Sequence, residues 1–218
     1  MSFNNNDGRG ERIYPQGYEP ETVPDKPDSM IRNQLLNLIL QSGPSEVIDT
    51  DLFAVMAKRR STRKFSDKPV ETTKIDKIIA AADTAPTAGN YQGFEIFYVK
   101  SPEKKKLLVD ACNGQPYVNS PVVLVFCKNP SRVKFDFPEY VLKKFAIQDA
   151  TLAAGYSQLA AQALGLSSIW IGMFDEQKVM DVIGTDLIPS SVLCIGYPKQ
   201  TKFPKPRRNL KDLVHVVW

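Results

Sequence analysis

The sequence predicts a fold that mixes α-helices with β-strands, because both kinds of hydrophobic periodicity occur along its 218 residues. Between Ile75 and Ala82, apolar residues recur at the i, i+3, i+4, i+7 spacing of one helix face. The runs 94–99 and 122–127 are instead short and mostly apolar, with the aromatic or β-branched content of buried strands. A chain of this length is most simply one domain with a sizeable core.

Residues 1–28 are rich in Asn, Gly, Pro and charge, so we expect a mobile N-terminal arm. A single domain should then occupy residues 29–218. Within it, Ser101-Pro102 should open a helix, Asp175 should cap the start of another, and Gly165 should end one. We expect helices at 29–42, 51–58, 75–82, 104–112, 145–164 and 176–184, and strands at 94–99, 122–127, 168–172, 192–197 and 213–218.

The longest helical pattern, 145–164, carries several alanines and Ser157, which would let another backbone approach closely. We therefore expect it to be the central buried helix. The preceding segment, 129–144, places aromatic residues among Pro and Lys, and its periodicity favours neither a helix nor a strand. It could form a lid over a site.

Composition narrows the classes of function. The formal net charge of +4 is compatible with an anionic ligand or nucleic acid but requires neither. The three cysteines, Cys112, Cys127 and Cys194, contain no C-x-x-C pair, and their odd number fits a reducing compartment best. The lone histidine, His215, excludes His-based metal clusters and Ser-His-Asp catalysis. No apolar run approaches the ~20 residues of a membrane span, so we expect a soluble, cytoplasmic protein.

The densest anion-binding stretch is RRSTR at 59–63, with three guanidinium groups and two hydroxyls. An arginine can bind a phosphate through parallel hydrogen bonds. Neither G-x-G-x-x-G nor G-x-x-x-x-G-K-[ST] occurs, so any phosphate must be held by side chains. A second basic cluster includes Lys205 and Arg207, and the two clusters could converge on one dianion. For either cluster alone, a solvated basic turn is the alternative.

Five motifs occur in order along the chain: RRSTR at 59–63, V-x-x-x-K-I-x-x-I-I-x-A-A from Val70, A-P-T-A-G-N-Y-Q at 85–92, L-A-A-x-A-L-G-L-x-S at 159–168, and I-G-Y-P with K-P-R near the C-terminus. Together they resemble the FMN-dependent nitroreductase family over residues 50–218. The resemblance implies an α+β fold with a central, mostly antiparallel sheet flanked by helices. It also implies a homodimer that binds FMN at its interface and exchanges C-terminal segments, with NAD(P)H as the electron donor.

The resemblance also implies a role for individual residues. Arg59 would contact the FMN phosphate, Ser61 the ribityl or phosphate end, and Arg63 the pyrimidine edge of the isoalloxazine ring. Arg60 is adjacent in the motif but could also point to solvent. The complete implied set of cofactor-binding residues is Arg59, Arg60, Ser61, Arg63, Pro86, Thr87, Asn90, Ile171, Gly172, Lys205 and Arg207.

The loop 86–90 would pass the flavin, where small residues let the backbone approach the ring. Ile171-Gly172 would direct a backbone N–H toward flavin N5, and Lys205 with Arg207 would complete the phosphate site, although Arg208 could replace Arg207. Many family members have Gln-Pro-Trp where this chain has Gln92-Gly93-Phe94. The resemblance therefore does not predict the shape of the site wall that residues 92–94 would form.

The expected function is NAD(P)H-dependent reduction of nitroaromatic compounds, quinones or related electron-poor substrates by a ping-pong mechanism. Such exchange needs an open, stackable flavin surface, so we assign no catalytic side chain and no metal ligand. One alternative is a specialised flavoenzyme of the same fold, such as a flavin-destroying dimethylbenzimidazole synthase or a reductive dehalogenase. Another is a basic nucleic-acid-binding module, although the aromatic residues are not interleaved with the basic clusters as a stacking platform requires.

Overall fold

The computed structural model describes residues 51–200 and 206–218. The predicted N-terminal arm, the helix expected at 29–42 and the site residue Lys205 lie outside the described residues. Four strands form one antiparallel sheet in the order β1-β2-β4-β3. The predicted antiparallel sheet is therefore confirmed. The strands are β1 (Phe94–Tyr98), β2 (Val122–Lys128), β3 (Ser167–Ile171) and β4 (Pro189–Gly196).

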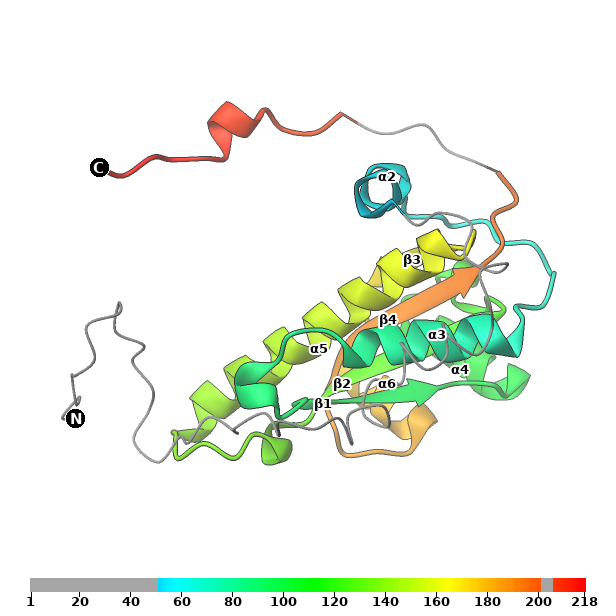
Figure 1. Cartoon of the computed structure of the whole chain (residues 1–218). Helices are drawn as coiled ribbons and strands as arrows, with labels where there is room; N and C mark the ends of the chain where they lie inside the picture. Colours follow the sequence, from blue (N-terminus) through cyan, green and yellow to red (C-terminus); the bar gives the residue numbers. More distant parts are fainter. Residues whose placement is uncertain (1–50, 201–205) are drawn as a thin grey trace, which may run out of the picture.

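Helices cover both faces of this sheet (Figure 1). The side chains of β2 alternate between two cores: Leu124 packs with α3 and α5, whereas Val123 and Val125 pack with α4 and α6. This division follows from the period of two along a strand, since successive side chains point to opposite faces. The helices are α2 (Leu52–Lys58), α3 (Thr72–Asp83), α4 (Pro102–Ala111), α5 (Glu139–Ala163) and α6 (Glu176–Ile183).

The helix boundaries follow the predicted cap residues. Ser101 accepts a hydrogen bond from the Lys104 amide at the start of α4, and Asp175 accepts one from the Lys178 amide at the start of α6. Gly165 follows α5 with φ +74°, in the left-handed region that a glycine adopts at little cost. These predicted caps are confirmed.

Two boundaries predicted from the sequence are wrong. Helix α5 begins at Glu139 rather than Phe145, so its first turns occupy the end of the segment that periodicity did not resolve. Residues 213–218 do not form a strand; a short 3-10 turn, η6 (Leu210–Asp212), is the only regular element in the described range 206–218. A strand needs a neighbour to accept its ladder hydrogen bonds, and this segment is exposed and extends away from the sheet (Figure 1).

The small-residue face of α5 is buried as predicted. Ala146, Ala150 and Ala153 are inaccessible to solvent, and the helix packs against α3 and the sheet. In the described ranges, 51–200 and 206–218, none of the helices is long and apolar enough to cross a membrane.

Candidate functional site

The stretch 59–66 is fixed to the edge of the sheet by backbone hydrogen bonds. The Thr62 amide donates to the Ser168 carbonyl at 3.0 Å, and the Ser66 amide donates to the Tyr197 carbonyl at 2.8 Å. Ser61 also forms an isolated parallel bridge with Ser168. Thr62 is buried, whereas Ser61 and Arg63 are exposed. The backbone is therefore held while the polar side chains on either side of Thr62 remain accessible.

The structure brings Arg59 close to Arg207. Partial burial lowers the pKa of the Arg59 guanidinium, and repulsion from Arg207 and then Arg60 lowers it further. The half-buried Arg59 and the exposed Arg207 therefore lie within electrostatic range of each other, and an anion would offset their repulsion. Arg207 of the second basic cluster is thus near Arg59, and the convergence of both clusters on one dianion stays a prediction.

Arg60 does not point freely into solvent. It is half-buried, and its Nη1 donates to the Ala57 carbonyl at 2.5 Å and to the Arg59 carbonyl at 2.6 Å. Its Nε is buried without a hydrogen-bond partner among the described residues. An unsatisfied buried donor is costly, so this atom suggests a ligand that supplies an acceptor.

Arg63 lies over an aromatic ring. Its Cζ is 5.9 Å from the centroid of the Tyr117 ring, within the range of a cation–π contact. The Tyr117 hydroxyl in turn donates to Gln115 Oε1. Tyr117 packs against the hydrophobic cluster that contains Ile171, which places Arg63 on the same side of the sheet as that residue.

Ile171 and Gly172 lie at the far end of β3 from the arginine stretch. Ser168 and Gly172 are four positions apart, which corresponds to about 13 Å along a strand. Ile171 is buried and Gly172 is exposed. A Cβ added at Gly172 would contact only the Trp170 ring, at 3.5 Å. The interior therefore does not require a glycine here, and the backbone of Gly172 is accessible from outside.

The loop between α3 and β1 is held from below by a carboxylate. Asp149 on α5 is 2% exposed, and its two oxygens accept hydrogen bonds from the amides of Ala88 and Gly93, each at 3.0 Å. Burial raises the pKa of Asp149, and the two amide bonds oppose that shift. Thr87 Oγ1 also accepts from the Gln92 amide at 3.2 Å, closing the loop on itself.

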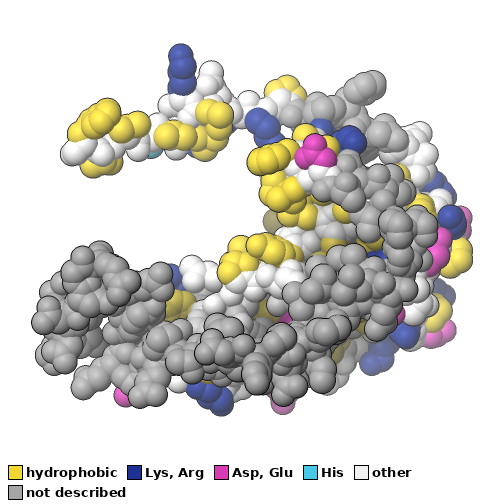
Figure 2. All heavy atoms as spheres, viewed as in Figure 1, with side chains coloured by type: hydrophobic (Ala, Val, Ile, Leu, Met, Phe, Trp, Pro, Cys, Tyr) yellow, Lys and Arg dark blue, Asp and Glu magenta, His cyan; other side chains and the backbone are white. Residues whose placement is uncertain are grey.

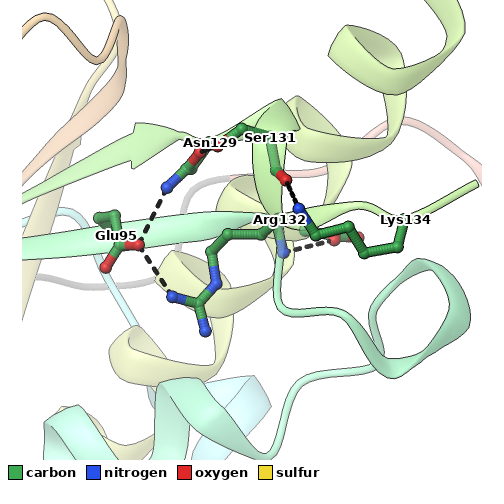
Figure 3. A network of polar contacts seen from close by, with 7 residues as sticks. Glu95, Asn129, Ser131, Arg132 and Lys134 are labelled. Carbon is green, nitrogen blue, oxygen red and sulfur yellow. Dashed lines mark hydrogen bonds and ion pairs between the residues drawn. The ribbon is translucent and has the colours of Figure 1, made fainter.

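The segment 129–137 packs against this loop. A Cβ added at Gly89 would lie 2.5 Å from Phe135, and the Phe135 and Tyr91 rings meet edge to face at 5.2 Å. Figure 3 shows the polar network that holds the segment: Glu95 Oε1 accepts from Asn129 at 3.0 Å and from Arg132 at 3.1 Å. Residues 129–137 thus form a strap that supports the loop.

An open groove of about 530 Å³ lies between the loop and α5. Exposed apolar side chains continue along the same helix at Ile147, Leu152 and Tyr156. Figure 2 shows hydrophobic side chains gathered along the hollow between the body of the domain and the C-terminal segment. The groove is lined by Pro86, Thr87, Ala88, Phe145, Gln148, Asp149, Thr151 and Leu152.

The loop and the basic cluster do not form one site within the described chain. The loop is bound to Asp149, whereas Ser168, beside the arginine stretch, accepts a hydrogen bond from Gln158 of the same helix at 3.3 Å. Nine residues at about 1.5 Å each place these two points about 14 Å apart along α5. Pro86, Thr87 and Asn90 therefore stand apart from Arg59, Arg60 and Arg207.

Sequence reasoning missed Asp149 and Tyr117. Asp149 lies on the same helix face as Ala146, Ala150 and Ala153. A charged residue on this small-residue face was the sequence signal that could have identified it. A charge in that position needs hydrogen-bonding partners. Tyr117 carried no such indication, because its contact with Arg63 depends on the tertiary fold.

Three comparisons with known proteins show the family to which this fold belongs. The model of the Nitroreductase family matches residues 56–197. An FMN reductase [NAD(P)H] of Bacillus subtilis is 30% identical over 168 residues, covering 70% of this chain and 68% of its own. An NADH dehydrogenase of Thermus thermophilus is 30% identical over 194 residues, covering 74% and 92%. The structure of an NADPH:FMN oxidoreductase from Vibrio harveyi, complexed with NAD+, superposes with a TM-score of 0.70 at 28% identity, covering 76% of each chain. The chain belongs to the nitroreductase family.

Proposed function

We propose that this chain reduces nitroaromatic compounds, quinones or related electron-poor molecules by a ping-pong mechanism in which NAD(P)H is the first substrate. The chain is an FMN-dependent NAD(P)H oxidoreductase, as its relatives named FMN reductase [NAD(P)H] and NADPH-flavin oxidoreductase support. The acceptor class and the order of the steps belong to the proposal.

The observation that carries the proposal is the proximity of two like charges, the half-buried Arg59 and the exposed Arg207. Two guanidinium groups close enough to repel each other are stabilised by a dianion, and the phosphate of FMN is one. The unpartnered Nε of Arg60 adds a buried donor beside them. These groups fit an FMN phosphate, and we assign Lys205 to the same site by the family resemblance.

The remaining assignments place the rest of the cofactor. Arg63, steadied by Tyr117, would face the pyrimidine edge, and Ser61 would bind the ribityl or phosphate end. The accessible backbone at Ile171-Gly172 would face N5, with about 13 Å of strand between it and the phosphate end. Pro86, Thr87 and Asn90 would border the flavin from the opposite side.

When bound, FMN supplies the hydride chemistry, and the chain binds and orients the reactants. Arg63 places a positive charge where electron density gathers on reduction. The open backbone of Gly172 leaves room for a planar substrate, and the apolar groove beside Pro86 excludes water from one side. We assign no proton transfer to a side chain.

We also propose that the working unit is a homodimer in the cytoplasm. Phe53 on α2 is 81% exposed, and Trp218 at the C-terminus is fully exposed. Large apolar side chains exposed together with the α5 face are unfavourable in a monomer, and a second copy would bury them. The extended segment 206–218 could then lie across the partner.

Flavin titration of apo-protein tests the phosphate site. Arg59→Ala and Arg207→Ala should each weaken FMN binding about 10-fold or more, because each removes a charge-assisted contact worth roughly 1.5 to 3 kcal/mol. Lys106→Ala, which removes an exposed charge from α4, is the control and should bind normally. Unchanged affinity in both arginine variants would refute the phosphate site, and protein purified without flavin absorbance would refute the function.

A further inference from the structure

We infer that Asp149 is a positioning residue for the reaction, because its carboxylate fixes both ends of the loop 88–93 at one wall of the proposed flavin site. The inference rests on the proposed function. Asp149 touches neither the arginines nor Gly172 in the contacts described above. It acts through the two amides that it binds, those of Ala88 and Gly93, each at 3.0 Å.

The placement of this carboxylate is not explained by packing alone. Its neighbours on the buried face of α5 are alanines, and Asp149 is itself 2% exposed. A buried carboxylate is costly unless its oxygens are hydrogen-bonded. Here each oxygen binds one backbone amide of the same loop, so the group bridges the loop's two ends.

The loop needs such support because its backbone is strained. Asn90 has φ +59° and Gln92 has φ +45°, in a region that residues other than glycine rarely adopt. Left-handed conformations of residues other than glycine persist where the surroundings impose them, and they concentrate at functional sites. Asp149, through its two hydrogen bonds, and the strap 129–137, through the Phe135 ring, supply that constraint.

Gly93 and Asp149 form a matched pair in this chain. The Gly93 N–H donates to Asp149 Oδ2, a bond that a proline at position 93 could not form. A Cβ at 93 would lie 2.8 Å from Val133 Cγ2, 3.0 Å from Asp149 Oδ2 and 3.3 Å from Ala146 Cα. The absence of a side chain thus lets α5 approach closely enough for the amide and the carboxylate to meet.

The consequence concerns the electron acceptor more than the cofactor's phosphate. Pro86, Thr87 and Ala88 line the groove beside Asp149, whereas the arginine stretch meets α5 about 14 Å away along the helix. Releasing one end of the loop should therefore reshape the wall that an acceptor contacts. FMN retention through Arg59 and Arg207 should change little.

The test compares Asp149→Asn with wild type, both saturated with FMN. The asparagine keeps the shape but has one acceptor oxygen, so one of the two amides loses its partner. We expect kcat/KM for a benzoquinone to fall about 10-fold, mainly through KM, while the FMN dissociation constant stays within about 2-fold. Hydrogen exchange at the Ala88 and Gly93 amides should become faster.

Ser157→Ala is the matched control, because it removes another buried side-chain bond of α5, from Ser157 Oγ to the Ile78 carbonyl at 3.2 Å. It should leave KM and the exchange of both loop amides unchanged. Equal kinetic losses in Asp149→Asn and in the control, or a loss of FMN as large as that of Arg59→Ala, would overturn the positioning role. A wild type that binds no FMN would instead overturn the proposed function on which it rests.

A second pair of variants tests the inference if Asp149→Asn does not fold. Gly93→Ala retains the carboxylate but pushes the loop against Val133, and it should raise KM for the quinone. Adding Val133→Ala removes the nearest clashing methyl group and should recover part of the loss. Normal kinetics in Gly93→Ala, or no recovery in the double variant, would contradict the inference.

Discussion

Replacing Arg63 by alanine should lower the two-electron midpoint potential of the bound flavin by roughly 20 mV. The proposed position of Arg63 at the pyrimidine edge puts a cation beside the charge that develops on reduction, so its loss destabilises the reduced state selectively. Arg63 is exposed, and solvent therefore screens the contact. At about 4 Å in water the interaction is ~1 kcal/mol, and ~1.4 kcal/mol corresponds to about 30 mV for a two-electron couple.

Spectroelectrochemical titration of the flavin-saturated variants measures this shift. Tyr117→Leu should lower the potential by a smaller amount, since it keeps the charge but removes the ring that orients it at 5.9 Å. Arg59→Ala should leave the potential nearly unchanged, because a phosphate carries the same charge in both redox states. An equal or larger shift in the Arg59 variant would show that the two arginines have the opposite roles.

Two further predictions concern stability and assembly. Tyr197 donates to Glu71 at 2.6 Å, which with smaller contributions lowers the Glu71 pKa from 4.5 to about 2. A carboxyl group whose pKa is lower in the folded state adds stability at pH values above its unfolded-state pKa. Tyr197→Phe should therefore be less stable than wild type in urea unfolding at neutral pH. The loss should be less than about 1 kcal/mol, because the Glu71 side chain is 44% exposed. The difference should shrink as the pH falls toward 2. Deleting 213–218 should reduce both dimer content in analytical ultracentrifugation and bound flavin; a yellow, stable monomer would contradict an interface-bound cofactor.

Local structure could be predicted where a single residue decides it. Ser101 and Asp175 each accept an amide hydrogen bond at the start of the helix that they were expected to cap. Gly165 and Gly184 end their helices in the left-handed conformation. In these cases the deciding interaction spans only a few residues, so the sequence carries the information.

Predictions failed where the deciding partner is distant. Helix α5 begins at Glu139, directly after its N-cap Pro138. The apolar pattern did not reveal these first turns, because they carry mostly exposed side chains. The apolar residues at 213–218 predicted a strand, but β-pairing needs a second strand that the described chain does not offer there. In the sequence, Asp149 is only a charged residue in an alanine-rich helix face. Its role becomes visible in the structure, where the amides of Ala88 and Gly93, which are distant in sequence, donate hydrogen bonds to it.

The separation of about 14 Å between the loop and the arginine stretch bears directly on the proposed homodimer. A two-fold axis makes each subunit present the same surface, so residue i of one copy meets residue j of the other and the reverse. The midpoint between Asp149 and Gln158 on α5 falls between Ala153 and Ala154, and at the next residue, Gly155, a Cβ would meet no atom within 4 Å. An axis near Gly155 would let the two α5 helices approach closely while burying Leu152 and Tyr156. Such an axis would bring the loop of one copy toward Arg59 of the other, so that each proposed site would use residues of both copies.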